Sequence, residues 1–167
     1  MSNRVDQRIV SLVPSQTELL YDLGLNDEVV GITKFCIHPN HWFRNKTRIG
    51  GTKDAKFDRV KALSPTLIIA NKEENVKEQV EALAAIAPVY TSDISTLEDA
   101  YHMIHEIGKI THTSSKAEDI IEKIKAGFLM LAEELDQQMP KTCLYLIWKD
   151  PYMSVGADTF IHDMMLH

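Results

Sequence analysis

The sequence predicts an α/β fold: a parallel-sheet N-terminal lobe with helices on both faces, a long connector helix and the start of a second α/β lobe. Short β-branched segments alternate with amphipathic ones, as in a parallel sheet whose crossovers are helices. A later amphipathic segment is long enough, at about 1.5 Å per residue, to cross a domain. We therefore expect three parts, at residues 1–112, 113–139 and 140–167, the last an incomplete second lobe.

The first strand and helix are indicated by a change of pattern at Pro14. Residues 9–13 are apolar and β-branched, as in a buried parallel strand. Ser15, with Glu18 three residues later, has the pattern of a helix capping box. The helix is expected to end at Gly24, since glycine commonly follows the last turn.

The remaining elements are predicted from the same two patterns, short β-branched runs for strands and amphipathic spacing for helices. The segment 34–52 is rich in glycine and aromatic residues and is predicted to be a long, functional loop. Ser95 is the candidate N-cap of the helix predicted over 96–110. The predicted strands are 29–33, 67–70, 88–90 and 143–148, and the predicted helices are 57–63, 75–86, 96–110, 114–138 and 158–166.

Composition excludes several classes of function. The formal net charge of −6 argues against nucleic-acid binding through a broad basic surface and favours a small organic or metal-chelate ligand, or a basic protein partner. Cys36 and Cys143 lie far apart and outside any C-x-x-C pattern, so no disulfide framework is expected. Cys143 lies in an apolar run and is expected in the core. The sequence also lacks a phosphate loop, a nucleophile elbow and H-E-x-x-H, so an enzyme is not expected.

The sequence indicates no membrane span, because no stretch is long and apolar enough. Residues 1–8 are polar and lack the apolar region of a signal peptide. Either the protein works without export, or its leader lies outside this sequence.

Several segments, taken in order, resemble one family. They are 8–19 (RIVSLVPSQTEL), 30–33 (VGIT), 49–52 (IGGT), 57–69 (FDRVKALSPTLII) and 151–161 (PYMSVGADTFI). Their order and spacing are similar to those of the helical-backbone solute-binding proteins, which include the cobalamin, iron-siderophore and haem receptors of ABC importers. The segment 113–139 falls where that family has its interlobe connector helix.

The resemblance implies a substrate-binding component of an ABC importer. Such a protein captures a corrinoid or metal chelate, such as cobalamin, a ferric siderophore or haem, in an interlobe cleft and then docks on a membrane permease. It would be periplasmic or exported, non-catalytic and without an intrinsic cofactor. The polar start keeps open an alternative, an intracellular ligand-binding or regulatory module that uses the same lobe and is cytoplasmic.

Candidate binding residues lie where strands are expected to end, which is where open α/β sheets bind ligands. Phe35 aligns with an aromatic residue of the family's cobalamin pocket, and Trp42 and Trp148 could also present flat faces to a macrocycle. Trp42 could instead pin its loop to the lobe. His38 could donate a hydrogen bond or bind a ligand's metal axially. Cys36, His38 and His41 number too few for a structural zinc site, so no metal site is expected.

Two further sets of residues complete the expected site. Lys72 could meet an anionic group of the ligand and Glu73 could accept a hydrogen bond, although this segment could instead be a solvated turn with Asn75 capping the next helix. Asp58 lies where the family has an acidic residue that meets the permease. It could equally be a favourable charge at a helix N-terminus.

Overall fold

The computed structural model describes residues 6–136, 138–139 and 141–167, and the chain forms two compact units, Met1–Asp93 and Ile94–His167. The units meet at residue 93, ahead of the boundary expected at 112. The reason is that α5 (Leu97–Ile110) packs on α6 (Ser114–Leu135) and so belongs with the long helix.

The first unit is built on a five-stranded sheet of order β3-β2-β1-β4-β5. Every pairing in it is parallel, so the α/β fold class is confirmed. The chain extends the sheet from β1 to one side and then returns to extend it on the other side, as in doubly wound folds. The strands are β1 (Ile9–Ser11), β2 (Val29–Ile32), β3 (Thr47–Arg48), β4 (Leu67–Asn71) and β5 (Val89–Ser92).

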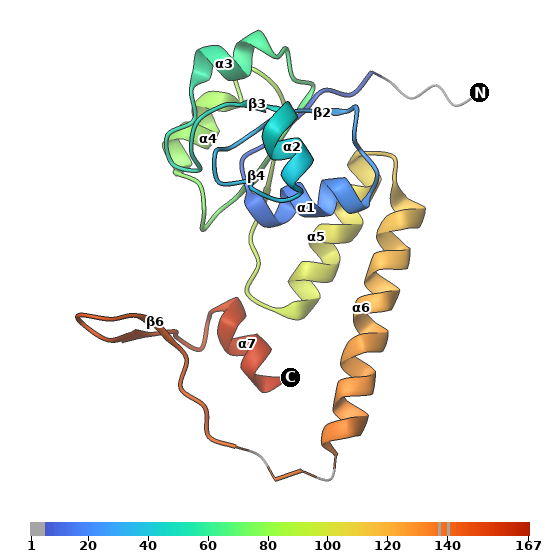
Figure 1. The fold of residues 1–167 in the computed structure, drawn as a ribbon, viewed down its shortest axis with the longest axis vertical. Helices are drawn as coiled ribbons and strands as arrows, with labels where there is room; N and C mark the ends of the chain where they lie inside the picture. Colours follow the sequence, from blue (N-terminus) through green and yellow to red (C-terminus); the bar gives the residue numbers. More distant parts are fainter. Residues whose placement is uncertain (1–5, 137, 140) are drawn as a thin grey trace. The chain divides into compact units, whose positions relative to one another are not determined.

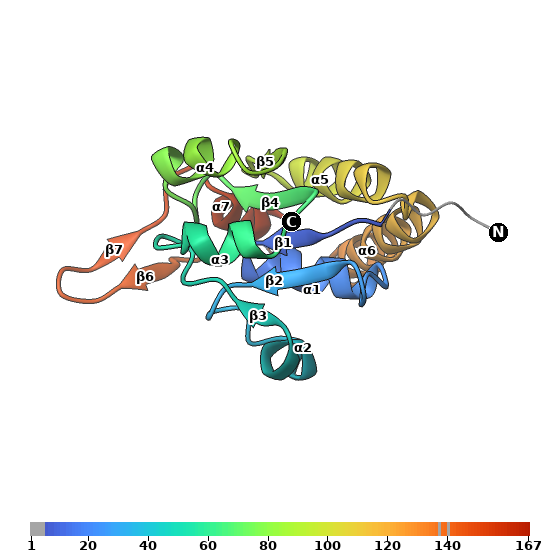
Figure 2. The ribbon, with the colours of Figure 1, turned by 90° about the horizontal axis from the view of Figure 1, so that it is seen from above.

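Helices cover both faces of this sheet, with α1 on one side and α3 on the other (Figures 1 and 2). Val10 and Ile68 point to the face that packs on Val60 of α3 and Leu83 of α4. Burial of these side chains, at roughly 25 cal/mol per Å² of apolar surface, stabilises this layer. The helices of the unit are α1 (Pro14–Asp22), α2 (Asn40–Asn45), α3 (Phe57–Ala62) and α4 (Lys77–Leu83).

Two predictions about the secondary structure of residues 13–52 were wrong. The capping box does not form, because Pro14 occupies the first turn of α1 and Val13 is the N-cap. Proline fits there because its ring fixes φ at a helical value and the first turn needs no N–H donor. The predicted loop 34–52 also contains α2 and β3, whose short lengths leave little periodicity to detect.

The second unit is centred on the α5–α6 pair. Thr96, and not Ser95, caps α5: its hydroxyl accepts a hydrogen bond from Asp99 N, and the Asp99 carboxylate accepts one from Thr96 N. Hydrogen bonds to the Asp99 carboxylate, first from the Thr96 side chain and next from the backbone N–H of Ser95, lower the pKa of Asp99. Gly108 and Ala117 lie at the crossing, where a Cβ on Gly108 would come within 2.4 Å of Ala117 Cβ.

The end of the chain forms a hairpin and a helix. β6 (Leu146–Trp148) pairs antiparallel with β7 (Met153–Ser154), and α7 (Phe160–Leu166) follows. The strand predicted over 143–148 is thus shorter, and Cys143 is exposed, contrary to its expected place in a core. Asp163 of α7 accepts a hydrogen bond from Leu97 N at 2.7 Å, which joins α7 to the start of α5.

No helix in the described part of the chain combines the length and apolarity that a membrane crossing requires.

A pair of glycine substitutions tests the α5–α6 crossing. Gly108→Ala should lower the free energy of unfolding by about 1–3 kcal/mol, because the added methyl group overpacks the contact with Ala117. Gly127→Ala on α6 has open space around its Cβ and should stabilise the helix by up to about 1 kcal/mol. Urea denaturation followed by circular dichroism measures both, and equal effects of the two changes would contradict the close crossing.

Candidate functional site

The carboxyl ends of the five strands meet at one edge of the sheet in the first unit. We call this the carboxyl edge, and define it as the loops 33–38, 49–56 and 72–76, the first turn of α1 and Asp93. β1 lies at the centre of the strand order, so the sheet's topological switch point lies beside it. Ligands of open α/β sheets bind at that position.

The loop after β2 presents Phe35 to solvent. Cys36 is fully buried, and its Sγ lies 3.2 Å from Thr17 Oγ1 and 3.1 Å from Thr33 Oγ1. Because Cys36 turns inward, its neighbours Phe35 and Ile37 turn outward, with 52% and 53% of their surfaces exposed. Phe35 is therefore an exposed aromatic ring on an anchored loop, as its predicted binding role requires.

A buried hydrogen-bond network joins the ends of three elements at this edge. The Ser92 hydroxyl, at the end of β5, accepts hydrogen bonds from the side-chain amides of Gln16 in α1 and Asn71 at the end of β4. All three side chains are buried. Since buried polar groups are costly unless paired, this network fixes the ends of β4 and β5 relative to α1.

The loop after β4 is a turn organised by Asn71. Asn71 Oδ1 accepts hydrogen bonds from the backbone N–H groups of Glu73 and Glu74, at 2.9 and 3.1 Å. Asn75 is buried, accepts a hydrogen bond from Asn71 N and donates one to the carbonyl of Thr52. The alternative in which Asn75 caps the following helix was wrong, since Val76 is the N-cap of α4.

Three lysines at the carboxyl edge, Lys34, Lys56 and Lys72, are paired with carboxylates. Lys72 is bonded to Asp93, and this hydrogen bond, together with the charge of Asp93, raises the pKa of Lys72. Asp54 lies between two lysines, with its oxygens 4.0 Å from Lys34 Nζ and 3.6 Å from Lys56 Nζ. A third contact, from Gly51 N to Asp54 Oδ1 at 2.8 Å, holds the carboxylate in place.

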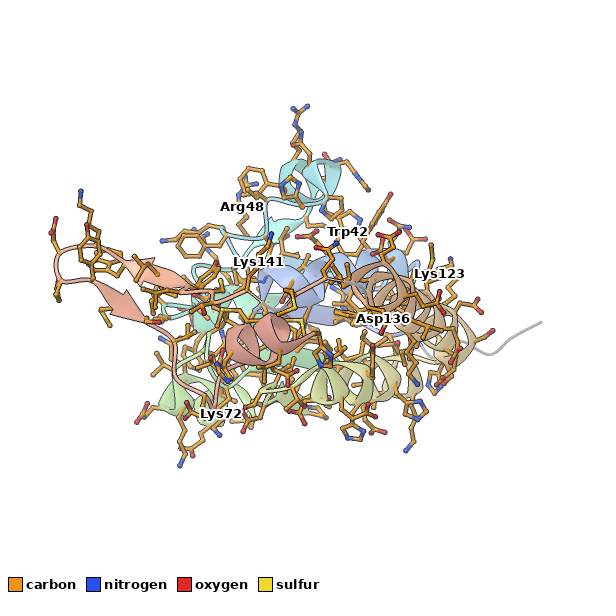
Figure 3. The ribbon with its side chains drawn as sticks, turned by 90° about the horizontal axis from the view of Figure 1, so that it is seen from below. Trp42, Arg48, Lys72, Lys123, Asp136 and Lys141 are labelled. Atoms are coloured by element: carbon orange, nitrogen blue, oxygen red, sulfur yellow. The ribbon has the colours of Figure 1, made fainter. Side chains whose placement is uncertain are left out.

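Trp42 does not present a face to a ligand. It is 1% exposed, its indole N–H donates to Asn26 Oδ1 at 3.0 Å, and its ring meets Tyr21 edge-on at 5.5 Å. Figure 3 shows Trp42 well apart from Lys72. The binding role predicted for Trp42 is therefore corrected: α2 uses this side chain to pin the β2–β3 connection to the lobe.

The other predicted residues lie on the surface. His38 and Glu73 are exposed on the loops after β2 and β4, at the carboxyl edge. Asp58 is exposed in the first turn of α3, beside an open groove of about 630 Å³ between α3 and α4. Trp148 belongs to the second unit, on β6, and is 64% exposed.

Metal ligands do not converge in the described residues, where no group of three or more histidine, cysteine or carboxylate side chains could hold an ion. In the Cys36, His38 and His41 pattern the thiol turns inward to the two threonines.

Sequence reasoning missed the roles of Gln16 and Ser92. The signal that could have found them is a polar residue at a position where the pattern predicts burial. Gln16 follows a buried strand and proline, and Ser92 ends the last strand. Gln16 lies within the family-like segment 8–19 and Ser92 lies in no motif, so their pairing emerges only from the strand order.

Comparison with known families and proteins gives a consistent result. The family model described as periplasmic binding protein matches residues 9–166. An uncharacterized ABC transporter substrate-binding lipoprotein of Bacillus subtilis is 27% identical over 95% of this chain and 52% of its own length. The vitamin B12-binding protein of Vibrio campbellii is 24% identical over 93% of this chain and 57% of its own length.

Solved structures of similar fold give the same result. A possible iron-binding (periplasmic solute-binding) protein from Staphylococcus epidermidis superposes with a TM-score of 0.83 at 22% identity, covering 96% of this chain and 64% of that one. The chain spans about half the length of the curated relatives it matches.

Substitution of Asn71 tests the network at the carboxyl edge. Asn71→Ala should lower the free energy of unfolding by about 1–3 kcal/mol, because it leaves two backbone N–H donors without their acceptor and removes one of the two hydrogen bonds that Ser92 Oγ accepts. Glu74→Ala keeps the backbone N–H and removes only an exposed side chain, so its effect should stay within about 0.5 kcal/mol. Chemical denaturation compares the two, and similar values would contradict a stabilising network.

Proposed function

Since this chain belongs to the periplasmic binding protein family, we propose that it captures a corrinoid or metal chelate as the substrate-binding component of an ABC importer. The curated relatives named above are a substrate-binding lipoprotein and a vitamin B12-binding protein. They favour this function over an intracellular regulatory module, and we place the protein outside the cytoplasmic membrane on the same ground.

The observation that carries the proposal is the anchored, exposed ring of Phe35 at the carboxyl edge. A flat aromatic surface can stack on a macrocycle or an aromatic chelate, because both have large apolar faces. The contacts of Cys36 with Thr17 and Thr33 hold that loop before any ligand arrives. A loop ordered in advance loses less conformational entropy on binding, which favours affinity.

Polar residues complete the proposed wall of the site. His38 would donate a hydrogen bond or bind a metal of the ligand axially, and Lys72 and Glu73 would meet polar groups at the rim. Trp148, on β6, remains a proposed ligand-binding residue in its own right. The permease would meet Asp58, whose exposed carboxylate suits a basic pocket and would contribute orientation and association rate more than affinity.

A thermal-shift titration of the full chain tests the proposed function. The panel comprises cyanocobalamin, haem, a ferric tris-catecholate and a ferric hydroxamate. At a concentration about 100 times Kd, a bound compound should stabilise the protein by about 2.7 kcal/mol, which corresponds to a rise in Tm of about 5–10 °C. A folded protein whose Tm responds to none of the four would contradict the proposal.

Phe35→Ala tests the aromatic contact. It should weaken binding of the responding compound about tenfold, since an interface aromatic residue commonly contributes more than 1 kcal/mol. Leu129→Ala is the matched control, because Leu129 is a similarly exposed apolar residue on α6. Isothermal titration calorimetry measures both affinities. Unchanged binding by the Phe35 variant would remove this residue from the site.

A further inference from the structure

The charges at the carboxyl edge cancel. Its loops carry equal numbers of lysines and carboxylates, so the formal charge of the edge is zero. The lysines are Lys34, Lys53, Lys56 and Lys72, and the carboxylates are Asp54, Glu73, Glu74 and Asp93.

Two aspartates form ion pairs with three of these four lysines. Asp93 pairs with Lys72 across the ends of β4 and β5. Asp54 reaches both Lys34 and Lys56 and is itself fixed by Gly51 N. These pairs are about half exposed or more, so they add little to stability. Their effect is on the field at the edge, because a lysine with a carboxylate at contact distance attracts a second anion much less.

The uncharged groups of the edge are complementary to an amide. Gln16 Oε1 is buried and, within the described residues, has no hydrogen-bond partner. Because this oxygen is buried, a water that bridges it to a ligand would satisfy it, whereas an anionic oxygen would not. No side chain caps α1, so the backbone N–H groups of Ser15 and Gln16 are the donors of its first turn, since Pro14 has no N–H and Thr17 N donates to Val13 O. A carboxamide supplies both the donor and the acceptor that these groups require.

Building on the proposed function, we propose that Asp54 and Asp93 are specificity determinants that make the carboxyl edge select an uncharged, carboxamide-bearing metal chelate over a polyanionic one. Corrinoids with amide side chains and neutral ferric hydroxamate peptides share this chemistry. Haem, with two propionates, and ferric tris-catecholates, with a net negative charge, do not. The two aspartates therefore decide between ligand classes that the Phe35 ring alone would accept.

The test is a binding matrix measured on the full chain by isothermal titration calorimetry at low ionic strength. The probes are cyanocobalamin, ferrichrome, haem and a ferric tris-catecholate. Comparing the first two shows whether the neutral ligand is a corrinoid or a ferric hydroxamate. Wild type should bind one of the neutral chelates at least about tenfold more tightly than either anion. Asp54→Asn and Asp93→Asn should each raise affinity for the tris-catecholate about fivefold and change affinity for the neutral chelate less than about twofold.

The variants are chosen to preserve structure. Asparagine can still accept the hydrogen bond from Gly51 N or from Lys72, so only the charge is removed. Asp22→Asn is the matched control, because it makes the same change of net charge on an exposed residue at the C-terminal end of α1, away from the carboxyl edge.

The outcomes separate this inference from the proposed function. Tighter binding of haem or the tris-catecholate than of both neutral chelates by wild type would overturn the inference and leave the proposed function standing. An equal gain for Asp22→Asn would overturn the role of the two aspartates, since net charge alone would then explain it. Binding of none of the four probes would count against the proposed function and the inference together.

Discussion

The parallel alignment of five strands is the constraint on which the rest of the first unit depends. It brings loops that are far apart in sequence to one edge, and the Ser92 hydroxyl secures that edge by accepting hydrogen bonds from Gln16 and Asn71. If the strands did not run in the same direction, the Phe35 loop and the paired lysines would not lie at the same edge. The site is therefore a consequence of topology, and the side chains supply its chemistry.

Much of this architecture could be predicted from the sequence, because apolar periodicity reports which residues face a core. The β-branched segments at 9–13, 29–33 and 67–70 all contain strands, and the long amphipathic segment after residue 113 is α6. The family resemblance was confirmed by the match over residues 9–166. Phe35 was proposed because it aligns with an aromatic residue of the family's cobalamin pocket and lies in the loop after a buried strand, and the structure shows its ring exposed in that loop.

The remaining features could not be predicted, because they depend on pairing between distant residues. Trp42 is an aromatic residue in a predicted loop, as many ligand-binding residues are. Only its hydrogen bond to Asn26, which is distant in sequence, shows that its role is structural. Ser15 has the right neighbours for a cap, but Pro14 takes the first helical position and moves the cap to Val13. Asp54 and Asp93 look like ordinary loop charges until the fold places lysines beside them.

We propose that ligand binds at the carboxyl edge of the first unit. Hydrogen–deuterium exchange of the full chain, with and without saturating cyanocobalamin, tests it most directly, since exchange reports local opening of each segment. We predict that cyanocobalamin slows exchange at the carboxyl edge and nowhere else in the first unit. The affected segments would be the loops 33–38, 49–56 and 72–76 and the first turn of α1. Protection in the groove between α3 and α4, with the carboxyl edge unchanged, would contradict the account.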